Sequence, residues 1–412
     1  MNKEKRRVPK LRFPGFTEDW EQCKLGDLAE IVRGASPRPI SDPKWFDNDS
    51  NVGWLRIADV TAQDGRIRYL EQKISELGQE KTRVIKTPHL LLSIAATVGK
   101  PVINYVPTGV HDGFLIFLNP KFNILYAFWW LEMFREKWNK YGQPGSQVNL
   151  NSDLVKNQVI NIPNEKEQEK ISSFLESLDK IITLHQRKLE HLNLKKKALL
   201  QKLFPKNGER YPELRFPGFT DAWEQCKLGS IGSTYTGLSG KTKEDFGHGE
   251  AQYITYLNVF QNTISDTTMT DKVEIDTTQN EVKYGDVLFT TSSETPEEVG
   301  MSSVWLSDTP NIYLNSFCFG FRPNQKIDPY FLGYSLRAPY MRDKIKILAQ
   351  GISRYNISKN KVMELEISMP NNEEQKLLGT FLQHIDLIIT LHQRKLEHLQ
   401  LQKKALLQQM FV

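Results

Sequence analysis

The chain has 412 residues, of which 39% are apolar and 25% are charged, and its formal net charge is +5. These values are ordinary for a soluble protein, and they predict a globular chain with room for two domains of ordinary size, each with its own core. The small net charge permits a nucleic-acid partner but does not require one.

The three cysteines, Cys23, Cys226 and Cys318, form no Cys-x-x-Cys motif. This spacing argues against a disulfide framework or a zinc knuckle and favours a reducing compartment, so we expect a cytoplasmic protein. The basic start of the chain is followed by prolines and an arginine rather than by the apolar core of an export signal. The longest apolar run, residues 90–98, is far shorter than the roughly 20 residues that a membrane-spanning helix needs.

The chain is a tandem duplication. Residues 11–26 recur as residues 214–229 with differences at only two positions, and residues 181–192 recur unchanged as residues 388–399. Between these ends only isolated residues match, such as Asn149 and Asn356. Because the ends are nearly identical and the middles differ, we expect two different domains on one shared frame.

Both middle regions have the pattern of a mixed α/β or β-rich domain. Short runs rich in apolar and β-branched residues predict strands at 54–57, 89–95, 101–105, 114–118, 253–256, 286–290 and 316–321. Helical spacing predicts helices at 126–140 and 329–350.

Each copy ends in a long helix. An asparagine that can cap the helix follows Pro163 and Pro370, and acidic residues occupy the first turn. Apolar residues then recur in steps of three and four, as in a coiled coil with a local stutter. In the first copy the stripe is Ile171, Phe174, Leu178, Ile181, His185, Leu189, Leu192, Leu199 and Leu203, and in the second it is Leu378, Phe381, Ile385, Ile388, His392, Leu396, Leu399, Leu406 and Met410.

A stripe on a helix of some 40 residues, roughly 60 Å long, must be covered, and the simplest cover is the other copy running antiparallel. We therefore predict an α+β fold: two mixed α/β domains in pseudo-twofold tandem repeat, separated by an antiparallel pair of long coiled-coil helices. The predicted segments are 1–163 and 205–370 for the domains, and 164–204 and 371–412 for the helices.

These residues resemble one known family along essentially the whole chain, the specificity subunits of type I restriction-modification systems. The resemblance rests on the doubled Leu-Arg-Phe-Pro-Gly-Phe openings, the Gly285-Asp286 strand start, the helix starts at 163–170 and 370–376, and the repeated Gln-Arg-Lys helices.

The resemblance implies that each domain is a target-recognition domain that reads one half of an asymmetric, bipartite site on double-stranded DNA. It further implies that the helices set the spacer and dock two methyltransferase subunits, which motor-nuclease subunits can join. S-adenosylmethionine, ATP and Mg are then expected on the partner subunits, with no cofactor, metal or membrane bound by this chain.

The absence of known catalytic motifs also favours a specificity subunit over an enzyme. The sequence has no Asp or Asn followed by Pro-Pro-aromatic, as in amino-methyltransferases, and no Gly-x-Gly-x-x-Gly turn. His185 and His191 lie six residues apart, which does not suit a helical metal pair. We therefore expect a non-catalytic subunit. The alternatives are a stand-alone DNA-modifying enzyme and a coiled-coil assembly scaffold that does not bind DNA.

Bases are read by Arg, Lys, Asn and Gln, supported by further groups on phosphates, and loops of the two domains are where we expect them. In the first domain the DNA-binding candidates are Arg33, Arg38, Lys44, Lys81, Arg83, Lys86, Lys100, Gln143, Gln147 and Asn149. In the second domain they are Lys241, Lys243, Thr291, Ser292, Ser293, Arg354, Tyr355 and Asn356.

Core packing explains identity at the apolar positions of the repeated helix, but not at the polar positions between them. A repeated exposed pattern indicates two copies of one partner. The predicted methyltransferase-docking residues are Gln186, Arg187, Lys188, Glu190, His191, Gln393, Arg394, Lys395, Glu397 and His398. The alternative is a solvated charged face retained from the duplication.

Overall fold

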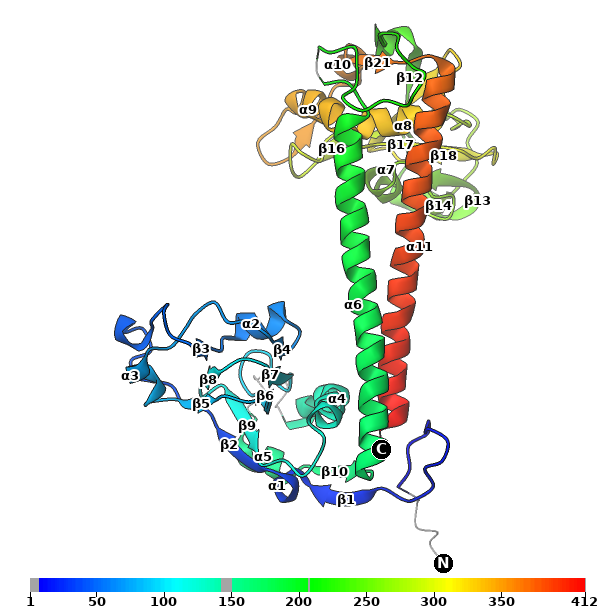
Figure 1. Cartoon of the computed structure of the whole chain (residues 1–412). Coiled ribbons are helices and arrows are strands. Elements are labelled where there is room, and N and C mark those ends of the chain that lie inside the picture. Colours follow the sequence, from blue (N-terminus) through cyan, green and yellow to red (C-terminus); the bar gives the residue numbers. More distant parts are fainter. Residues whose placement is uncertain (1–6, 142–149, 207, 412) are drawn as a thin grey trace, which may run out of the picture. The chain divides into compact units, whose positions relative to one another are not determined.

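The computed structural model describes residues 7–141, 150–206 and 208–411. Tertiary contacts divide the chain into two units, a first unit of Met1–Gln186 with Lys395–Val412 and a second unit of Arg187–Arg394. This division cuts both long helices, so each unit contains one domain, half of its own helix and half of the other helix (Figure 1). The segment boundaries given above follow a different criterion and stay a prediction.

The domain of the first unit is built on two sheets. A five-stranded sheet has the order β2-β9-β6-β7-β4, and a three-stranded sheet has the order β3-β8-β5. Their strands are β2 (Glu30–Arg33), β9 (Phe114–Leu118), β6 (Leu90–Ser93), β7 (Pro101–Asn104), β4 (Arg66–Ile67), β3 (Gly53–Trp54), β8 (Thr108–Val110) and β5 (Arg83–Ile85). The apolar helix α4 (Ile124–Phe134) adds Tyr126, Trp129 and Trp130 to the core beside these strands.

The domain of the second unit repeats this plan with a different middle. Its sheets have the orders β12-β19-β15-β17, β14-β13-β18 and β16-β20. Their strands are β12 (Gly232–Thr236), β19 (Cys318–Pro323), β15 (Val287–Thr290), β17 (Ser302–Val304), β14 (Thr270–Val273), β13 (Phe246–Ile254), β18 (Ile312–Leu314), β16 (Ser292–Ser293) and β20 (Tyr355–Asn356). Helix α8 (Pro329–Arg337) packs on β17.

Short helices connect these strands. They are α1 (Leu25–Leu28), α2 (Ile57–Ala62), α3 (Glu76–Gln79), α5 (Ser152–Lys156), α7 (Tyr256–Gln261), α9 (Pro339–Ile347) and α10 (Lys359–Met363).

The repeated opening segment fastens each domain to its long helix. In the first copy β1 (Glu21–Lys24) pairs with β10 (Val159–Ile162), and in the second β11 (Glu224–Lys227) pairs with β21 (Glu366–Met369) in the same antiparallel register. Arg12 binds Glu167 through two hydrogen bonds of 2.7 and 2.8 Å, and Arg215 binds Glu374 in the same way. Both carboxylates are buried, so these ion pairs belong to the shared frame.

The two long helices are α6 (Glu165–Lys202) and α11 (Asn372–Met410). The first unit holds the start of α6 with the end of α11, and the second holds the end of α6 with the start of α11, so the helices run antiparallel. Figure 1 draws α6 in green beside α11 in orange to red. The predicted antiparallel pair is confirmed.

Equivalent ion pairs join the helices in each unit. Lys403 binds Asp179 in the first unit, and Lys196 lies 2.5 Å from Asp386 in the second. Both partners of one pair lie 207 positions from their counterparts in the other pair, which is the spacing of the sequence repeat. The duplication therefore extends to tertiary contacts that hold the two helices together.

The ends of the two helices also dock in equivalent places. Met410 and Phe411 are buried in the core of the first domain, where the Phe411 ring lies 5.4 Å from that of Tyr126. Leu203 and Phe204 occupy the corresponding position in the second unit. Each helix therefore ends inside the core that belongs to the other copy.

The predicted apolar stripe is partly wrong. Phe174 and Ile181 are 39% and 46% exposed, whereas Leu175 and Ile182 are buried. The prediction assumed that one face of the helix packs on one partner. In the first unit α6 has two partners, because Leu175 packs into the domain core while the helix also contacts the end of α11.

Several element boundaries also differ from prediction. Residues 55–57 do not form a strand, because Arg56 caps α2 through Asp59. The strand predicted at 253–256 ends at Ile254, where Thr255 caps α7. The helix predicted at 126–140 becomes a 3-10 helix from Arg135, and Pro339 divides the helix predicted at 329–350.

Candidate nucleic-acid interface

Three of the predicted arginines of the first domain form one exposed cluster around Asp112. The Nε of Arg33 donates to the Asp112 carbonyl at 2.6 Å, and a guanidinium nitrogen of Arg38 lies 2.7 Å from the carboxylate. The Nε of Arg83 donates to the Arg33 carbonyl at 2.8 Å, which joins the end of β2 to the start of β5. All three arginines are exposed, and the Arg38 side chain is 75% exposed. The cluster therefore presents several N–H donors from a supported surface, as binding to phosphates or base edges requires.

Electrostatics hold this cluster in place. Burial raises the pKa of Asp112, but the hydrogen bond from Ser36 and the charges of Arg38 and Arg33 outweigh it, so that the pKa lies below its usual value. The carboxylate is therefore charged at neutral pH and orders the surrounding guanidinium groups. Sequence reasoning missed Asp112, because nothing local connects it to arginines more than 70 positions earlier.

Lys44, Lys81 and Lys86 are exposed, as expected for groups that contact phosphates. The Lys44 ammonium lies 2.8 Å from Asp42 and 4.5 Å from the centre of the Trp45 ring.

Lys100 is placed differently from what was predicted. Its side chain is only 11% exposed, and its ammonium binds Asp64 at 2.6 Å and also Glu132. Burial lowers the pKa of Lys100, but the charges of Glu132 and Asp64 outweigh it, so that the pKa is raised. The Lys100 ammonium is therefore occupied by two carboxylates within the fold, unlike the exposed Lys44, Lys81 and Lys86. Gln143, Gln147 and Asn149 lie outside the described residues.

The structure brings most candidates of the second domain together at β16 and β20. Ser292 pairs with Asn356 and Ser293 with Tyr355 in antiparallel register, while Thr291 directly precedes β16. The Ser292 and Ser293 side chains are buried, and the Ser293 hydroxyl donates to the Thr295 carbonyl. These serines therefore build the ribbon, whereas Arg354 and Asn356 are exposed on it.

The two lysines at the start of the second domain lie on another segment. Lys241 is 2.8 Å from Asp276 and mostly covered, whereas Lys243 is exposed. A hydrogen bond to Asp276 raises the pKa of Lys241. Only Lys243 of this pair presents an exposed charge.

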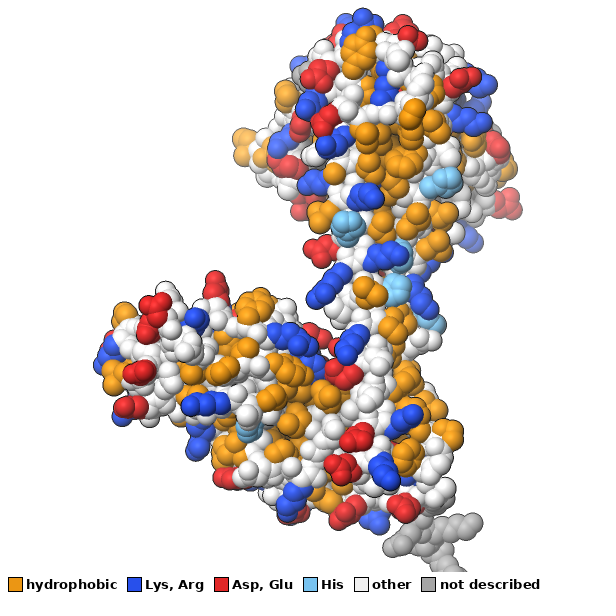
Figure 2. All heavy atoms as spheres, viewed as in Figure 1, with side chains coloured by type: hydrophobic (Ala, Val, Ile, Leu, Met, Phe, Trp, Pro, Cys, Tyr) orange, Lys and Arg blue, Asp and Glu red, His pale blue; other side chains and the backbone are white. Residues whose placement is uncertain are grey.

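All the predicted docking residues on the long helices are exposed. Apolar neighbours share this exposure, since Ile181 and Leu184 are 46% and 65% exposed, and Ile388 and Leu391 are 44% and 55% exposed at the equivalent positions. Figure 2 shows basic and histidine side chains beside apolar ones along the exposed stretch of the helices. Such a surface suits a protein partner better than solvent alone.

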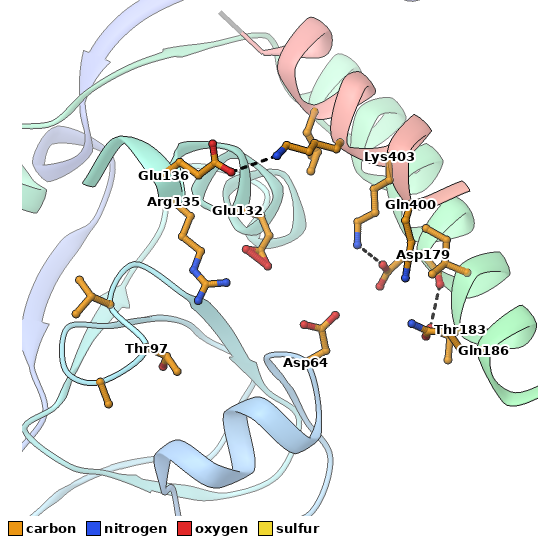
Figure 3. A pocket seen from close by; sticks show the side chains of 15 residues that line it. Asp64, Thr97, Glu132, Arg135, Glu136, Asp179, Thr183, Gln186, Gln400 and Lys403 are labelled. Carbon is orange, nitrogen blue, oxygen red and sulfur yellow. Dashed lines mark hydrogen bonds and ion pairs between the residues drawn. The ribbon is translucent and has the colours of Figure 1, made fainter. Parts of the chain in front are cut away.

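A cleft of about 740 Å³ lies in the first unit between α4, the loop after β6 and the two helices (Figure 3). Glu132 and Asp64 hold Lys100 here, and Asp179 holds Lys403. Across the described ranges, no group of three or more His, Cys, Asp or Glu residues is arranged to hold a metal ion. The ion pairs of Lys100 lie within the domain, and the pair of Lys403 with Asp179 joins the two helices. Lys404 and Glu136, 3.4 Å apart, join the domain to α11.

The family model for the type I restriction modification DNA specificity domain matches residues 17–194 and again residues 220–401. The chain belongs to the type I restriction-modification specificity family. The two matches cover both copies of the repeat, so each copy carries one specificity domain together with most of its own long helix.

Relatives of this family match along nearly the whole chain. The type I restriction enzyme MjaVIII specificity subunit of Methanocaldococcus jannaschii is 23% identical, over 96% of this chain and 92% of the relative. The putative type I restriction enzyme MjaX specificity subunit of the same organism is 24% identical, over 97% and 94%.

Solved structures show the same fold. The S subunit of the type I restriction-modification system from M. genitalium aligns with a TM-score of 0.56 at 13% identity, over 98% of this chain and 99% of that one. A chain from a study of complex assembly and conformational transition of the type I system aligns with a TM-score of 0.58 at 16% identity, over 94% and 96%. The predicted family, fold class and general role in DNA specificity are confirmed.

None of the helices in the described ranges combines the length and apolar content of a membrane span.

Proposed function

We propose that this chain selects DNA for a multi-subunit methyltransferase, and that each recognition domain reads one half of an asymmetric, bipartite site. The observation that carries the proposal is the contrast between a frame that is equivalent in both units and polar surfaces that are not. The frame is equivalent because the ion pair of Lys403 with Asp179 in the first unit recurs as Lys196 with Asp386 in the second.

The two recognition surfaces differ in chemistry. The first domain presents the arginine cluster around Asp112, and the second presents a ribbon of small polar residues with Arg354. Base pairs differ in the donors and acceptors on their edges, so different side chains select different sequences. An asymmetric site is therefore the expected target.

Two methyltransferase subunits would dock on the repeated exposed positions of α6 and α11. Those subunits would carry S-adenosylmethionine, and motor-nuclease subunits, if they join, would use ATP and Mg. This chain contributes the choice of sequence and, through the length of its helices, the spacer between the half-sites.

Genome-wide mapping of methylated adenines tests this proposal. The chain is co-expressed with a methyltransferase subunit of a type I system that forms a complex with it, in a host that lacks other adenine methylation. We expect one split motif with two unlike halves and a fixed spacer. A continuous or palindromic motif would contradict the proposal.

The purified chain alone provides the control that separates the rival functions. With S-adenosylmethionine and DNA it should transfer no methyl group, and transfer without a partner would favour a stand-alone enzyme. With its methyltransferase it should bind DNA selectively and more weakly as salt rises, because basic side chains displace counterions from phosphates. A complex without such binding would favour a scaffold that does not contact DNA.

A further inference from the structure

The second recognition domain carries a short hairpin with an exposed apolar tip. Gln350 and Asn356 exchange two backbone hydrogen bonds of 2.9 Å, and the chain turns between them. Gly351 makes the turn at a φ of +141°, where a Cβ would lie 2.0 Å from the Arg354 carbonyl oxygen. The next residue, Ile352, is 96% exposed.

This tip is supported rather than loose. Asn356 and Tyr355 continue the hairpin into the β16–β20 pairing, so the tip projects from a two-stranded ribbon. The Arg354 guanidinium lies 5.8 Å from the centre of the Phe317 ring. The Phe317 carbonyl in turn accepts hydrogen bonds from the Thr291 backbone N–H at 2.9 Å and its hydroxyl at 2.7 Å.

Other apolar side chains are exposed beside the hairpin. Phe317 is 55% exposed, and Leu257, which lines the same cavity of about 430 Å³ as Arg354, is 56% exposed. Single exposed apolar residues are common on protein surfaces. Three of them around one exposed arginine on a supported ribbon are typical of a contact surface instead. We call Leu257, Phe317, Ile352 and Arg354 the tip surface.

The charges nearby show what kind of contact fits. Glu294 and Glu298 line the cavity next to Arg354 and would repel phosphate groups. Carboxylates accept hydrogen bonds from the amino group of cytosine, and arginine donates two to the O6 and N7 of guanine. The tip surface therefore suits base edges better than the DNA backbone.

A hairpin of two chain segments fits the major groove of DNA better than the minor groove. The major groove, about 12 Å wide, admits a two-stranded ribbon, whereas the minor groove is only about 6 Å wide. The thymine methyl group, which an apolar side chain can contact, also lies in the major groove.

We propose that the tip of hairpin 350–356 enters the major groove of one half-site, where Arg354 reads a guanine and Ile352 contacts a neighbouring thymine methyl group. This inference rests on the proposed function, since it assigns the bases read by one of the two domains.

The test uses the complex of the chain with its methyltransferase, and oligonucleotides that carry the mapped motif. Each guanine of the motif is replaced in turn by 7-deazaguanine, which lacks the N7 acceptor, and each thymine by uracil, which lacks the methyl group. One 7-deazaguanine should weaken binding by wild type about 10-fold or more and leave binding by Arg354→Ala unchanged. One uracil should weaken binding by wild type several-fold and leave Ile352→Ala unchanged.

Two further variants serve as controls. Arg354→Lys keeps the charge but loses the two-pronged donor geometry, so it should bind non-specific DNA normally and relax the motif at that one guanine. Ile347→Ala removes another exposed isoleucine, 82% exposed and lining a different cavity, and should behave as wild type.

The outcomes separate the two proposals. If the wild-type complex gives no split motif, the proposed function fails. If the motif is split but neither base analogue couples to Arg354 or Ile352, the inference about the hairpin fails and the proposed function stands. If inosine in place of guanine, which removes only the minor-groove amino group, weakens binding by wild type but not by Arg354→Ala, the tip lies in the minor groove and the inference is also overturned.

Discussion

At the scale of single residues, the buried carboxylates of the shared frame are each paired with an arginine. The arginines of the two recognition surfaces are instead exposed. Glu167 and Glu374 are each 1% exposed and each held by one arginine. Removing one partner of a buried ion pair leaves an uncompensated charge, which costs more than the pair itself contributes.

Arg12→Ala should therefore lower the free energy of unfolding of the first unit by about 3 kcal/mol, because Glu167 is left buried and unpaired. Denaturant unfolding and amide hydrogen exchange of the full chain measure this. Arg12→Ala combined with Glu167→Gln should recover part of the loss. Equal loss in the single and double variants would show that the carboxylate charge is not the cause.

His111 makes the first domain sensitive to pH. Burial lowers the pKa of His111, and the neighbouring carboxylate of Asp112 offsets this only in part. The ring packs against Phe114 and Trp54, and its Nδ1 accepts a hydrogen bond from the Gly113 N–H at 2.9 Å. The folded state therefore favours the neutral ring.

Because the unfolded chain protonates His111 near pH 6.5 and the folded chain only at lower pH, the domain should lose stability as the pH falls below about 6.5. Amide exchange around β8 and β9 at pH 7.5 and pH 5.5 measures this loss. His111→Asn, which keeps an acceptor but does not titrate, should show a smaller difference between the two pH values. An equal difference would assign the pH dependence to other groups.

At the scale of elements, one ion pair joins α6 to α11 in each unit, and the two pairs occupy equivalent positions of the repeat. Lys403 and Asp179 are about one-fifth exposed, so solvent screens their attraction only in part. The same holds roughly for Lys196 and Asp386.

Lys403→Glu places two carboxylates together and should destabilise the first unit, whereas Lys403→Glu with Asp179→Lys should restore most of the loss. A double-mutant cycle on the free energy of unfolding should give a coupling of about 1 kcal/mol. The matched control is Lys404→Glu, because Lys404 and its partner Glu136 are 64% and 78% exposed and lie 3.4 Å apart. A cycle that closes without coupling would mean that the pair does not help to join the helices.

The sequence predicted these elements unevenly, for physical reasons. The long helices, their antiparallel pairing and most strands follow from periodicity and from the repeat. The buried face of α6 was misplaced, because periodicity cannot show that a helix packs on two partners at once. The break at Pro339 and the short strand at Trp54 depend on capping and proline effects that override the apolar pattern.

The candidate site was predicted less well than the fold. Exposed arginines such as Arg33 and Arg38 could be found from residue type, but their partner Asp112 could not, because tertiary structure alone brings it to them. Lys100 has a suitable residue type yet is buried between two carboxylates. Ile352 was missed, since an apolar residue in a loop gives no signal of a base contact until its exposure is known.

At the scale of the whole molecule, our account holds that one pair of continuous helices carries two unlike readers and thereby sets the distance between their half-sites. Equivalent contacts at the C-terminal ends of the two helices support this view: Phe411 docks in one domain core and Phe204 in the other.

The most direct test is to lengthen both helices by seven residues at equivalent positions and to map the methylated motif again. Seven residues keep the faces of a helix nearly in register and lengthen it by about 10 Å. This added length equals about three base pairs of DNA. The account predicts both half-motifs unchanged and a spacer longer by about that amount, with weaker binding because the second half-site turns around the DNA axis. If methylation becomes too weak to map, binding to oligonucleotides of varied spacer gives the same readout. An unchanged spacer, or a change in either half-motif, would contradict the account.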